Sequence, residues 1–499
     1  MTTTSLRRRL DSFSLRWQAR LDSEWSDRVL PWLVAVALFV VLVVPALAQA
    51  RSLDAGLDLA VAAQAASRIR EGAEPVDTIG TGVNFLAQQA AFGFYPVALV
   101  TLVVPTVPAL LIVQSGALAL AVVPLWKLCR RLANLRVGAT ATVVFAYAVY
   151  PVMHNLNLEG FHLEVVAVPG LLAMFVFGLT GRWRPFAVCV AVVLASRADL
   201  GLAVAGFGGL LVVEGRRRAG WITLGVGLAW TALCAVVIQP ALGDGTFPHL
   251  SAFSGFGDSP GSVTWGMLRD PGEVLGRLFS EVNFDLVVTL LAPVLFLPVL
   301  APRYLVPVLP LQFVYLVAEV PPEARFGQQT VAATAFVFLA TAFALSRIGR
   351  RGVEKITVDH RVLGALLVAG SMFFVRDAAS SPYRQPWEWG GQDAADGVRL
   401  AAAETIPDDA AVRASASVLL LLAERPVVEH LDPGMPPDPG LVGAGVDFVV
   451  VDGAQVPSWT HGQRVAFRGR MERAGFEVVL EGQDITLYAR RGVARNEVG

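Results

Sequence analysis

Charged residues are scarce in this chain of 499 residues. Lys, Arg, Asp and Glu together make up 16% of it, whereas soluble domains carry about 25%. They are also unevenly spread, because residues 78–126, 137–158, 219–243 and 326–346 contain none of them. Such stretches match or exceed the roughly 20 apolar residues that cross a bilayer. The scarcity of charge therefore excludes an ordinary soluble enzyme and predicts a polytopic α-helical membrane protein.

Several other features are missing as well. The net charge is -1, so no overall field favours nucleic acid as a partner. The three cysteines have neither disulfide nor metal-ligand spacing. The sequence also contains no P-loop, no dinucleotide-binding glycine motif and no Gly-x-Ser-x-Gly motif. These absences exclude a nucleic-acid-binding protein, a disulfide scaffold and a serine hydrolase of the usual kind.

Basic residues gather in five clusters between the apolar stretches. Cytoplasmic loops next to membrane spans carry an excess of Lys and Arg, so we expect all five clusters in the cytoplasm. The clusters are Arg7, Arg8, Arg9, Arg16, Arg20 and Arg28; Lys127, Arg130, Arg131 and Arg136; Arg182 and Arg184; Arg216, Arg217 and Arg218; and Arg347, Arg350, Arg351 and Lys355.

Placing these clusters on one side predicts about eleven spans within a transmembrane region over residues 30–376. The expected spans are 30–50, 108–126, 137–153, 163–181, 185–196, 200–214, 219–239, 286–302, 304–319, 327–346 and 361–376. Residues 51–107 and 240–285 then form outer loops, and the apolar segment 92–106 is re-entrant or interfacial. The basic segment 1–29 stays in the cytoplasm and is attracted by anionic membrane lipid. The protein is thus expected in the cytoplasmic membrane as a multi-pass protein.

The last part of the chain changes character. Polar and turn residues return, residues 446–451 and 476–480 have the composition of strands, and residues 393–405 that of a helix. We therefore expect residues 377–499 to form a small α/β domain on the extracytoplasmic side. Its polar residues, among them Ser415 and Ser417, are interpreted as domain surface.

Ionisable residues in or just above membrane helices are functional candidates by default, and here they fall in the outer loops. Asp58 follows the first span, and Asp54 lies four residues earlier, on the same face if the segment is helical. A carboxylate at this position suits a general base that takes a proton from a hydroxyl group. The alternative is a solvated surface helix with Asp54 near its N-terminus as a cap.

A second group of candidates lies in the short loop before the span at 163–181. Glu159, His162 and Glu164 combine carboxylates with an imidazole, and such groups hold a divalent cation or a phosphate-bearing head group. The alternative is an interfacial loop whose polar residues cap the next helix.

The third group is at the tip of the short hairpin 185–214. Arg197 and Asp199 stand between two apolar runs, so they either neutralise each other or leave guanidinium donors free to grip a phosphate. Arg325, in a late outer loop, is a further candidate for substrate binding.

Six short motifs occur in an order that resembles a large bacterial family of predicted membrane proteins of unknown function, itself distantly similar to the GT-C glycosyltransferases. The motifs are Leu57-Asp58-Leu59 with Gln64, Gly82-Val83-Asn84-Phe85-Leu86, Glu159-Gly160-Phe161-His162-Leu163-Glu164, Ser196-Arg197-Ala198-Asp199, Gly257-Asp258-Ser259-Pro260 and Leu300-Ala301-Pro302-Arg303. The resemblance spans roughly residues 30–490.

This resemblance implies a GT-C-like membrane fold that takes a polyprenyl-phosphate sugar as donor on the outer face, with Asp58 as the matching base and Asp54 beside it. The cofactor stays open, and a divalent cation is one option. Family members usually carry an Asp-His pair where this chain has Gln88-Gln89. The leading hypothesis is therefore a glycosyltransferase-like protein of the cell envelope. The alternatives are a catalytically inert binding or assembly protein on the same scaffold, or a lipid or polysaccharide transporter.

Overall fold

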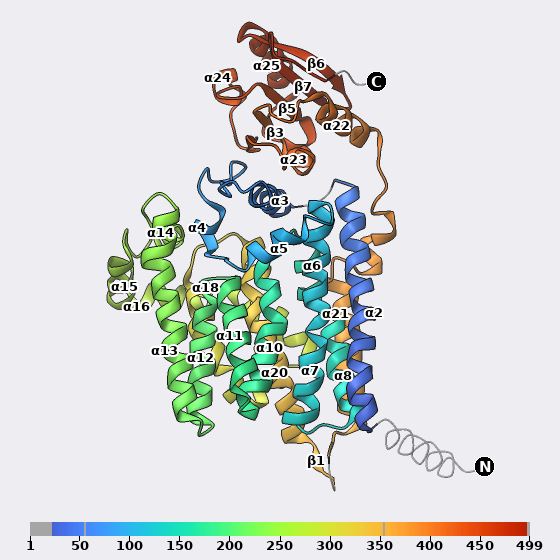
Figure 1. The fold of residues 1–499 in the computed structure, drawn as a ribbon, viewed down its shortest axis with the longest axis vertical. Coiled ribbons are helices and arrows are strands. Elements are labelled where there is room, and N and C mark those ends of the chain that lie inside the picture. Colours follow the sequence, from blue (N-terminus) through green and yellow to red (C-terminus); the bar gives the residue numbers. More distant parts are fainter. Residues whose placement is uncertain (1–21, 54–55, 353–354, 497–499) are drawn as a thin grey trace, which may run out of the picture.

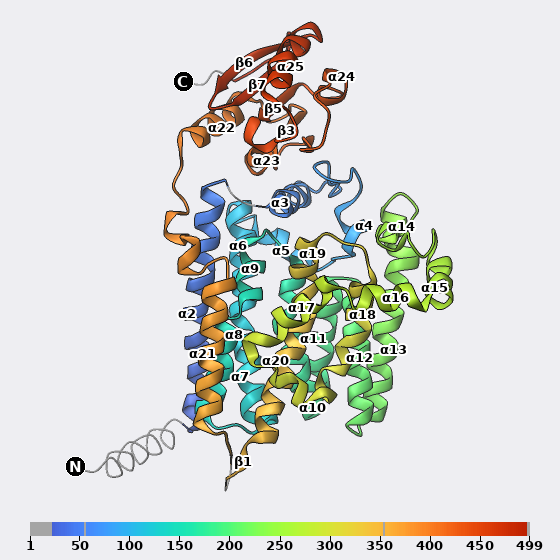
Figure 2. The same ribbon diagram turned by 180° about the vertical axis from the view of Figure 1, so that it is seen from behind.

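The computed structural model describes residues 22–53, 56–352 and 355–496. A bundle of long helices forms the larger part of the molecule, and a β-sheet with flanking helices stands above one end of it (Figures 1 and 2). We call the end of the bundle that faces this sheet the upper end, and the opposite end the lower end.

Residues 24–377 are almost entirely helical. Their α-helices are α2 (Glu24–Arg51), α3 (Leu57–Arg70), α4 (Phe85–Gln89), α5 (Phe94–Val100), α6 (Thr106–Leu120), α7 (Val122–Lys127), α8 (Val137–Ala148), α9 (Pro151–Leu158), α10 (Ala167–Thr180), α11 (Trp183–Ser196), α12 (Leu200–Val213), α13 (Arg217–Leu233), α14 (Gln239–Leu242), α15 (Pro260–Arg269), α16 (Pro271–Leu278), α17 (Glu281–Leu291), α18 (Leu309–Val317), α19 (Pro322–Phe326), α20 (Val331–Ile348) and α21 (His360–Asp377). A short antiparallel hairpin, β1 (Arg350–Arg351) and β2 (Ile356–Thr357), joins the last two.

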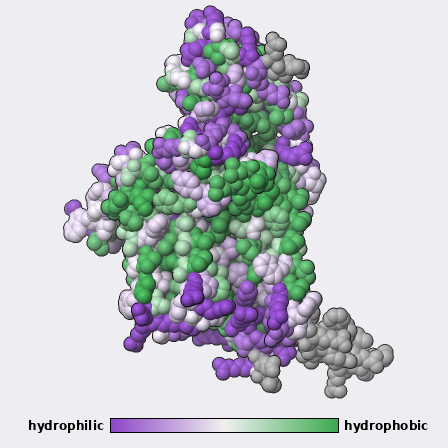
Figure 3. Space-filling view, in the orientation of Figure 1, coloured by the Kyte–Doolittle hydropathy of each residue, from purple (hydrophilic) through white to green (hydrophobic). Residues whose placement is uncertain are grey.

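Seven helical segments within the described residues are long and apolar enough to cross a membrane. They are Glu24–Arg51, Thr106–Leu132, Val137–Leu158, Leu163–Thr180, Arg217–Leu242, Ala324–Ile348 and His360–Glu388. Three shorter apolar helices accompany them: Trp183–Ser196, Leu200–Val213 and Pro302–Val317. In the space-filling view a hydrophobic belt covers the bundle between hydrophilic surfaces at the upper and lower ends (Figure 3). This is the surface of a membrane-embedded helical protein.

The segment expected as a span over 286–302 is not one continuous helix. Helix α17 ends at Leu291, and short 3-10 turns follow as far as Val308. Proline lacks the backbone donor that a helix needs and clashes with the preceding turn. Between the end of α17 and the start of α18 the chain contains four prolines at short intervals: Pro293, Pro298, Pro302 and Pro307.

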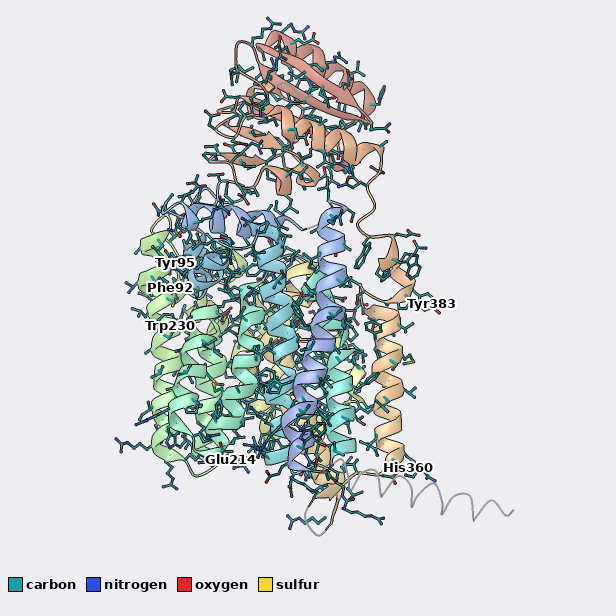
Figure 4. All side chains as sticks on the ribbon, turned by 45° about the vertical axis from the view of Figure 1, so that its right-hand side comes forward. Phe92, Tyr95, Glu214, Trp230, His360 and Tyr383 are labelled. Atoms are coloured by element: carbon teal, nitrogen blue, oxygen red, sulfur yellow. The ribbon has the colours of Figure 1, made fainter. Side chains whose placement is uncertain are left out.

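Contacts bring the described basic clusters together at the lower end. Arg130 pairs with Asp22 at 2.7 Å, and Lys355 donates to the Arg130 carbonyl oxygen at 2.8 Å. Arg303 pairs with Glu214 at 3.1 Å. Glu214 and His360 both lie near the lower end in the side-chain view, whereas Phe92 and Tyr95 lie near the upper end (Figure 4). Positive charge is therefore concentrated at one end of the bundle.

The C-terminal residues form a five-stranded mixed sheet of order β4-β3-β5-β7-β6. Strands β3, β4 and β5 are parallel, whereas β7 runs antiparallel to both β5 and β6. The elements are α22 (Ala394–Thr405), β3 (Val412–Ala414), α23 (Ala416–Leu422), β4 (Val428–His430), α24 (Pro439–Val442), β5 (Phe448–Asp452), α25 (His461–Arg473), β6 (Phe476–Gly482) and β7 (Ile485–Arg490).

Helix α3 lies between the bundle and the C-terminal sheet (Figures 1 and 2). Its small buried side chains share one apolar core with α23 and with the first turns of α6. Polar contacts add to this docking, because Arg70 pairs with Glu424 at 2.8 Å and the Thr78 hydroxyl donates to the Val428 carbonyl oxygen at 2.7 Å. The helix that carries Asp58 is thus held from both sides.

Candidate functional site

Asp58 occupies the first turn of α3, at the upper end of the bundle. Gly56 precedes the helix as its N-cap, and the Asp58 side chain is 59% exposed. A carboxylate in the first turn is favoured there by the partial positive charge of the helix N-terminus. Asp54, the neighbouring candidate, lies outside the described residues.

Two glycines bring the α3 segment against the loop that follows α9. A Cβ atom on Gly56 would lie 2.1 Å from the Glu159 carbonyl oxygen, and one on Gly160 would lie 3.2 Å from the Asp58 Cβ atom. Gly160 also has a φ of +149°, which side chains rarely tolerate. The two backbones therefore touch because neither position carries a side chain.

This close approach places His162 beside Asp58. The Nδ1 atom of His162 lies 3.8 Å from Oδ2 of Asp58 and 4.0 Å from Oε1 of Glu164. The His162 side chain is 7% exposed and that of Glu164 is 1% exposed. The imidazole thus stands between an exposed carboxylate and a buried one.

A glutamine that sequence reasoning missed holds this loop in place. Gln114 in α6 is fully buried, donates to the Gly160 carbonyl oxygen at 2.8 Å and accepts from the His162 backbone N–H at 2.7 Å. Its only signal in the sequence is an uncharged polar residue inside a long apolar stretch.

Arg197 and Asp199 meet the same cluster from the tip between α11 and α12. Arg197 donates from Nη1 to Glu164 Oε1 at 3.1 Å, and its Nη2 atom lies 3.0 Å from Asp199 Oδ2. Glu164 therefore joins Arg197 to His162, and through His162 to Asp58. The structure thus brings residues of three separately predicted groups together: Asp58, the pair His162 and Glu164, and the pair Arg197 and Asp199.

Two more residues, also missed from the sequence, complete the surroundings of Arg197. The Tyr315 hydroxyl donates to Asp199 at 2.7 Å, and the Arg197 guanidinium lies 5.6 Å from the centre of the Tyr315 ring. Gln328 accepts from Arg197 Nη1 at 3.1 Å. Both come from segments far along the chain, so nothing in the local sequence marked them.

The segment between α4 and α5 supports the tip. The Ala198 backbone N–H donates to the Gln89 carbonyl oxygen at 2.9 Å, and that of Gly93 donates to the Ala195 carbonyl oxygen at 2.7 Å. The Gln88 carbonyl oxygen accepts from Gln239 at 2.7 Å. Gln89 therefore positions the tip through its main-chain oxygen, whereas that of Gln88 binds the segment after α13.

Two of the predicted site residues occupy other surroundings. Arg325 donates to Asn283 and, at 2.7 Å, to the Ala318 carbonyl oxygen, rather than to the residues around Arg197. Glu159 lies at the end of α9 with an exposed side chain. Its main-chain carbonyl faces the Asp58 segment at Gly56.

The cluster has an excess of acid. Asp58, Glu164 and Asp199 outnumber the single cation Arg197. Three buried polar atoms at this point, Nε2 of His162, Oε2 of Glu164 and Oδ1 of Asp199, have no hydrogen-bond partner among the described residues. Buried polar atoms normally find a partner, so these three atoms are exceptions among the described residues. Within the described ranges, no group of three or more His, Cys, Asp or Glu side chains has the arrangement of a metal site.

The serines of the C-terminal sheet differ from the prediction. Ser415 and Ser417 are buried rather than on the surface. Ser417 donates to the Asp452 carboxylate at 2.8 Å, which also pairs with Arg399 at 2.7 Å. Asp452 terminates β5 and needs these donors because it is itself buried. This group stabilises the sheet.

Comparison with known structures gives a helical membrane fold. The chain is similar to ArnT from Cupriavidus metallidurans, crystallised with undecaprenyl phosphate, with 12% identity, a TM-score of 0.50, and coverage of 95% of this chain and 100% of that one. It is also similar to the mycobacterial arabinofuranosyltransferase AftD, with 15% identity, a TM-score of 0.45, and coverage of 91% and 39%. The oligosaccharyltransferase from Archaeoglobus fulgidus matches with 13% identity, a TM-score of 0.46, and coverage of 92% and 74%.

These neighbours are GT-C glycosyltransferases, so the expected structural resemblance is confirmed. At such low identity the likeness to ArnT shows the fold alone. No curated protein matches the chain. The model of one family, described as "Predicted membrane protein (DUF2079)", matches residues 49–464. Because this match spans most of the chain, the protein belongs to the DUF2079 family of predicted membrane proteins.

Proposed function

We propose that this protein is a glycosyltransferase-like membrane protein that binds a polyprenyl-phosphate sugar at the upper end of its helical bundle. In this proposal the upper end faces the outside of the cytoplasmic membrane, the N-terminus is cytoplasmic, and residues 377–499 are an extracytoplasmic α/β domain. The concentration of basic residues at the lower end supports this orientation.

The observation that carries the proposal is the line of side chains from Asp58 through His162 and Glu164 to Arg197. It joins an exposed carboxylate to a guanidinium group in one site at the bundle surface. A sugar transferase needs both groups in one site. The carboxylate takes the proton of the acceptor hydroxyl, and the guanidinium stabilises the departing phosphate. The ArnT structure was obtained with undecaprenyl phosphate, which supports a lipid phosphate as the ligand here.

Each group has a defined part in the proposed transfer. The acceptor oxygen bonds to the anomeric carbon while the bond from that carbon to the phosphate oxygen breaks. Asp58 takes the hydroxyl proton, and general-base help of this kind contributes about 10²- to 10⁴-fold. The polyprenyl phosphate leaves with the electron pair, and Arg197 stabilises its charge. A single displacement of this kind inverts the anomeric centre.

Glu164 and Asp199 orient Arg197 but also reduce its attraction for phosphate. Arg197 is the single cation among three carboxylates, so a bound phosphate requires further positive charge. A divalent cation carried with the phosphate would supply it. Because no group of acids and imidazoles among the described residues has the arrangement of a metal site, we assign no residues of this protein to such an ion.

A second candidate function is binding without catalysis. The donors of Arg197 are already taken by Glu164, Asp199 and Gln328, and Gln88-Gln89 replaces the Asp-His pair usual in the family. Both features fit a protein that recognises a lipid-linked glycan during assembly. Transport is the least supported alternative, because Phe175 packs against both Phe207 and Phe336 in the bundle core and all three are fully buried.

The test uses the full-length protein and the lipid that purifies with it. We expect mass spectrometry to find polyprenyl phosphate with the native protein and with Arg277→Ala, a control that removes another upper-end arginine. Arg197→Ala is expected to lose it. Absence of polyprenyl phosphate from the native protein would overturn the proposal. If Asp58→Asn retains the lipid and the native protein transfers no sugar from it, the binding function is the correct one.

A further inference from the structure

A groove with apolar walls opens at the lower end of the bundle, between α11 and α13. Its volume is about 830 Å³, within the roughly 300–1,000 Å³ of typical small-molecule sites. Phe186, Val190 and Leu194 line one wall, and Ile222 and Val226 line the other. These residues recur at helical spacing, so each wall is one continuous face of its helix.

The groove exists because α13 packs tightly on α12 and leaves its other face uncovered. A Cβ atom on Gly220 would lie 2.7 Å from the Gly208 carbonyl oxygen, and one on Gly227 would lie 2.3 Å from that of Gly201. Small residues let two membrane helices approach this closely. The larger side chains of α13 therefore point away from α12, and Ile222 is 57% exposed.

Three consecutive arginines line the groove where α13 begins. Arg216 is engaged, because its guanidinium lies 5.8 Å from the centre of the Trp183 ring and donates to the Leu179 carbonyl oxygen. Arg217 and Arg218 are exposed. Throughout the part of the chain that the structure describes, neither of these two makes a hydrogen bond or an ion pair. The groove therefore has apolar walls and, at its mouth, two positive charges that no acidic side chain among the described residues neutralises.

We propose that this groove binds an anionic phospholipid. Its phosphate contacts Arg217 and Arg218, and one acyl chain lies between α11 and α13. The positive charge at the mouth favours an anionic head group. The acyl chain packs closely against the groove walls, and this packing favours the groove over the surrounding lipid. The arginines at its mouth lie where α13 begins, whereas Arg197 follows the opposite end of α11, so the head-group site is separate from the proposed transfer site.

The experiment measures lipids retained by the full-length protein. The protein is placed in nanodiscs of equimolar phosphatidylglycerol and phosphatidylcholine, released, and analysed by native mass spectrometry. We expect retained phosphatidylglycerol to exceed phosphatidylcholine. The double variant Arg217→Gln with Arg218→Gln should lower phosphatidylglycerol retention by about tenfold, since each basic residue near an anionic head group adds to its binding.

Two further variants make the result specific. Arg350→Gln with Arg351→Gln removes the same charge from the lower end, outside the groove, and should leave retention unchanged. Ala187→Trp fills the groove, keeps every arginine, and should also release the lipid. Equal retention of both lipids by the native protein would overturn the proposal. The proposal would also be overturned if the Arg350 and Arg351 control lost as much phosphatidylglycerol, or if Ala187→Trp lost none. Either outcome would mean that surface charge alone retains the lipid, with no acyl chain in the groove.

Discussion

The Nδ1 atom of His162 lies 3.8 Å from Oδ2 of Asp58, which joins the helix above the bundle to the loop after α9. His162 is buried while Asp58 is exposed, so the carboxylate faces solvent with an imidazole behind it. Glu164 continues the line to Arg197. The proposed chemistry depends on this geometry, and the following changes test it.

Asp58→Asn should abolish most sugar transfer while leaving lipid binding intact. The amide keeps the shape of the side chain but accepts no proton, so we expect a loss of about 10²- to 10⁴-fold. Transfer from a polyprenyl-phosphate sugar in vesicles gives the measurement. Glu71→Gln, at the other end of the same helix, is the control and should retain activity. Native activity in Asp58→Asn would exclude this residue as the base.

Arg197→Gln should destabilise the protein more than the double variant Arg197→Gln with Glu164→Gln. The single change leaves the Glu164 carboxylate, which is 1% exposed, without its cation. Removing one partner of a buried ion pair lowers the free energy of unfolding by about 3–5 kcal/mol. Neutralising Glu164 removes most of that penalty. Unfolding of the purified protein with denaturant measures both. Equal losses in the two variants would show that Glu164 does not depend on Arg197.

Gly160→Ala should disturb the contact between α3 and the loop that carries His162. The new Cβ atom would press on Asp58 Cβ, and the φ of +149° suits glycine alone, so we expect a cost of about 1–3 kcal/mol. Gly209→Ala is the matched control, because the space around Gly209 is open and alanine favours a helix. Melting temperatures distinguish them, and an unchanged value for Gly160→Ala would contradict the close packing.

Docking of the C-terminal sheet on α3 should weaken in acid. Burial alone would raise the pKa of Glu424, but donors from Arg70 and Thr106 outweigh it and hold this pKa below its ordinary value of 4.5. The contact therefore stabilises the folded state above pH 4.5 and is lost as the pH falls through the lower folded value.

Hydrogen exchange of residues 64–79 measures this docking. The protection of these amides, corrected for their slower intrinsic exchange in acid, should fall in the native protein as the pH drops below 4.5. Glu424→Gln should exchange faster at neutral pH and show little further change in acid. The same acid response in native protein and variant would assign the effect to another group.

Much of the candidate site was predictable, because charge in a membrane protein is rare and therefore informative. Asp58, His162, Glu164, Arg197 and Asp199 stood out against apolar surroundings and meet in one cluster. Uncharged polar residues gave no such signal. Gln114, Tyr315 and Gln328 all contact the cluster, yet their local sequence gives at most the weak signal of a polar residue in an apolar stretch.

One expected span, residues 286–302, was wrong for a related reason. Hydropathy over residues 286–302 is that of a membrane helix, but hydropathy does not measure whether the backbone can form one. Four prolines between α17 and α18 turn the segment into 3-10 turns. Arg325 was grouped with the site because it follows a late outer loop, whereas packing directs it to Asn283.

The amino-acid sequence alone determined that this chain is a helical membrane protein and that its positive charge is segregated from its candidate acids. Both follow from the free energy of transferring each residue from water to lipid, which depends on local composition. Only the tertiary structure decided which charged residues meet. That outcome depends on the shapes of surfaces distant in the chain, as where Gly56 and Gly160 let two backbones touch and so set His162 beside Asp58.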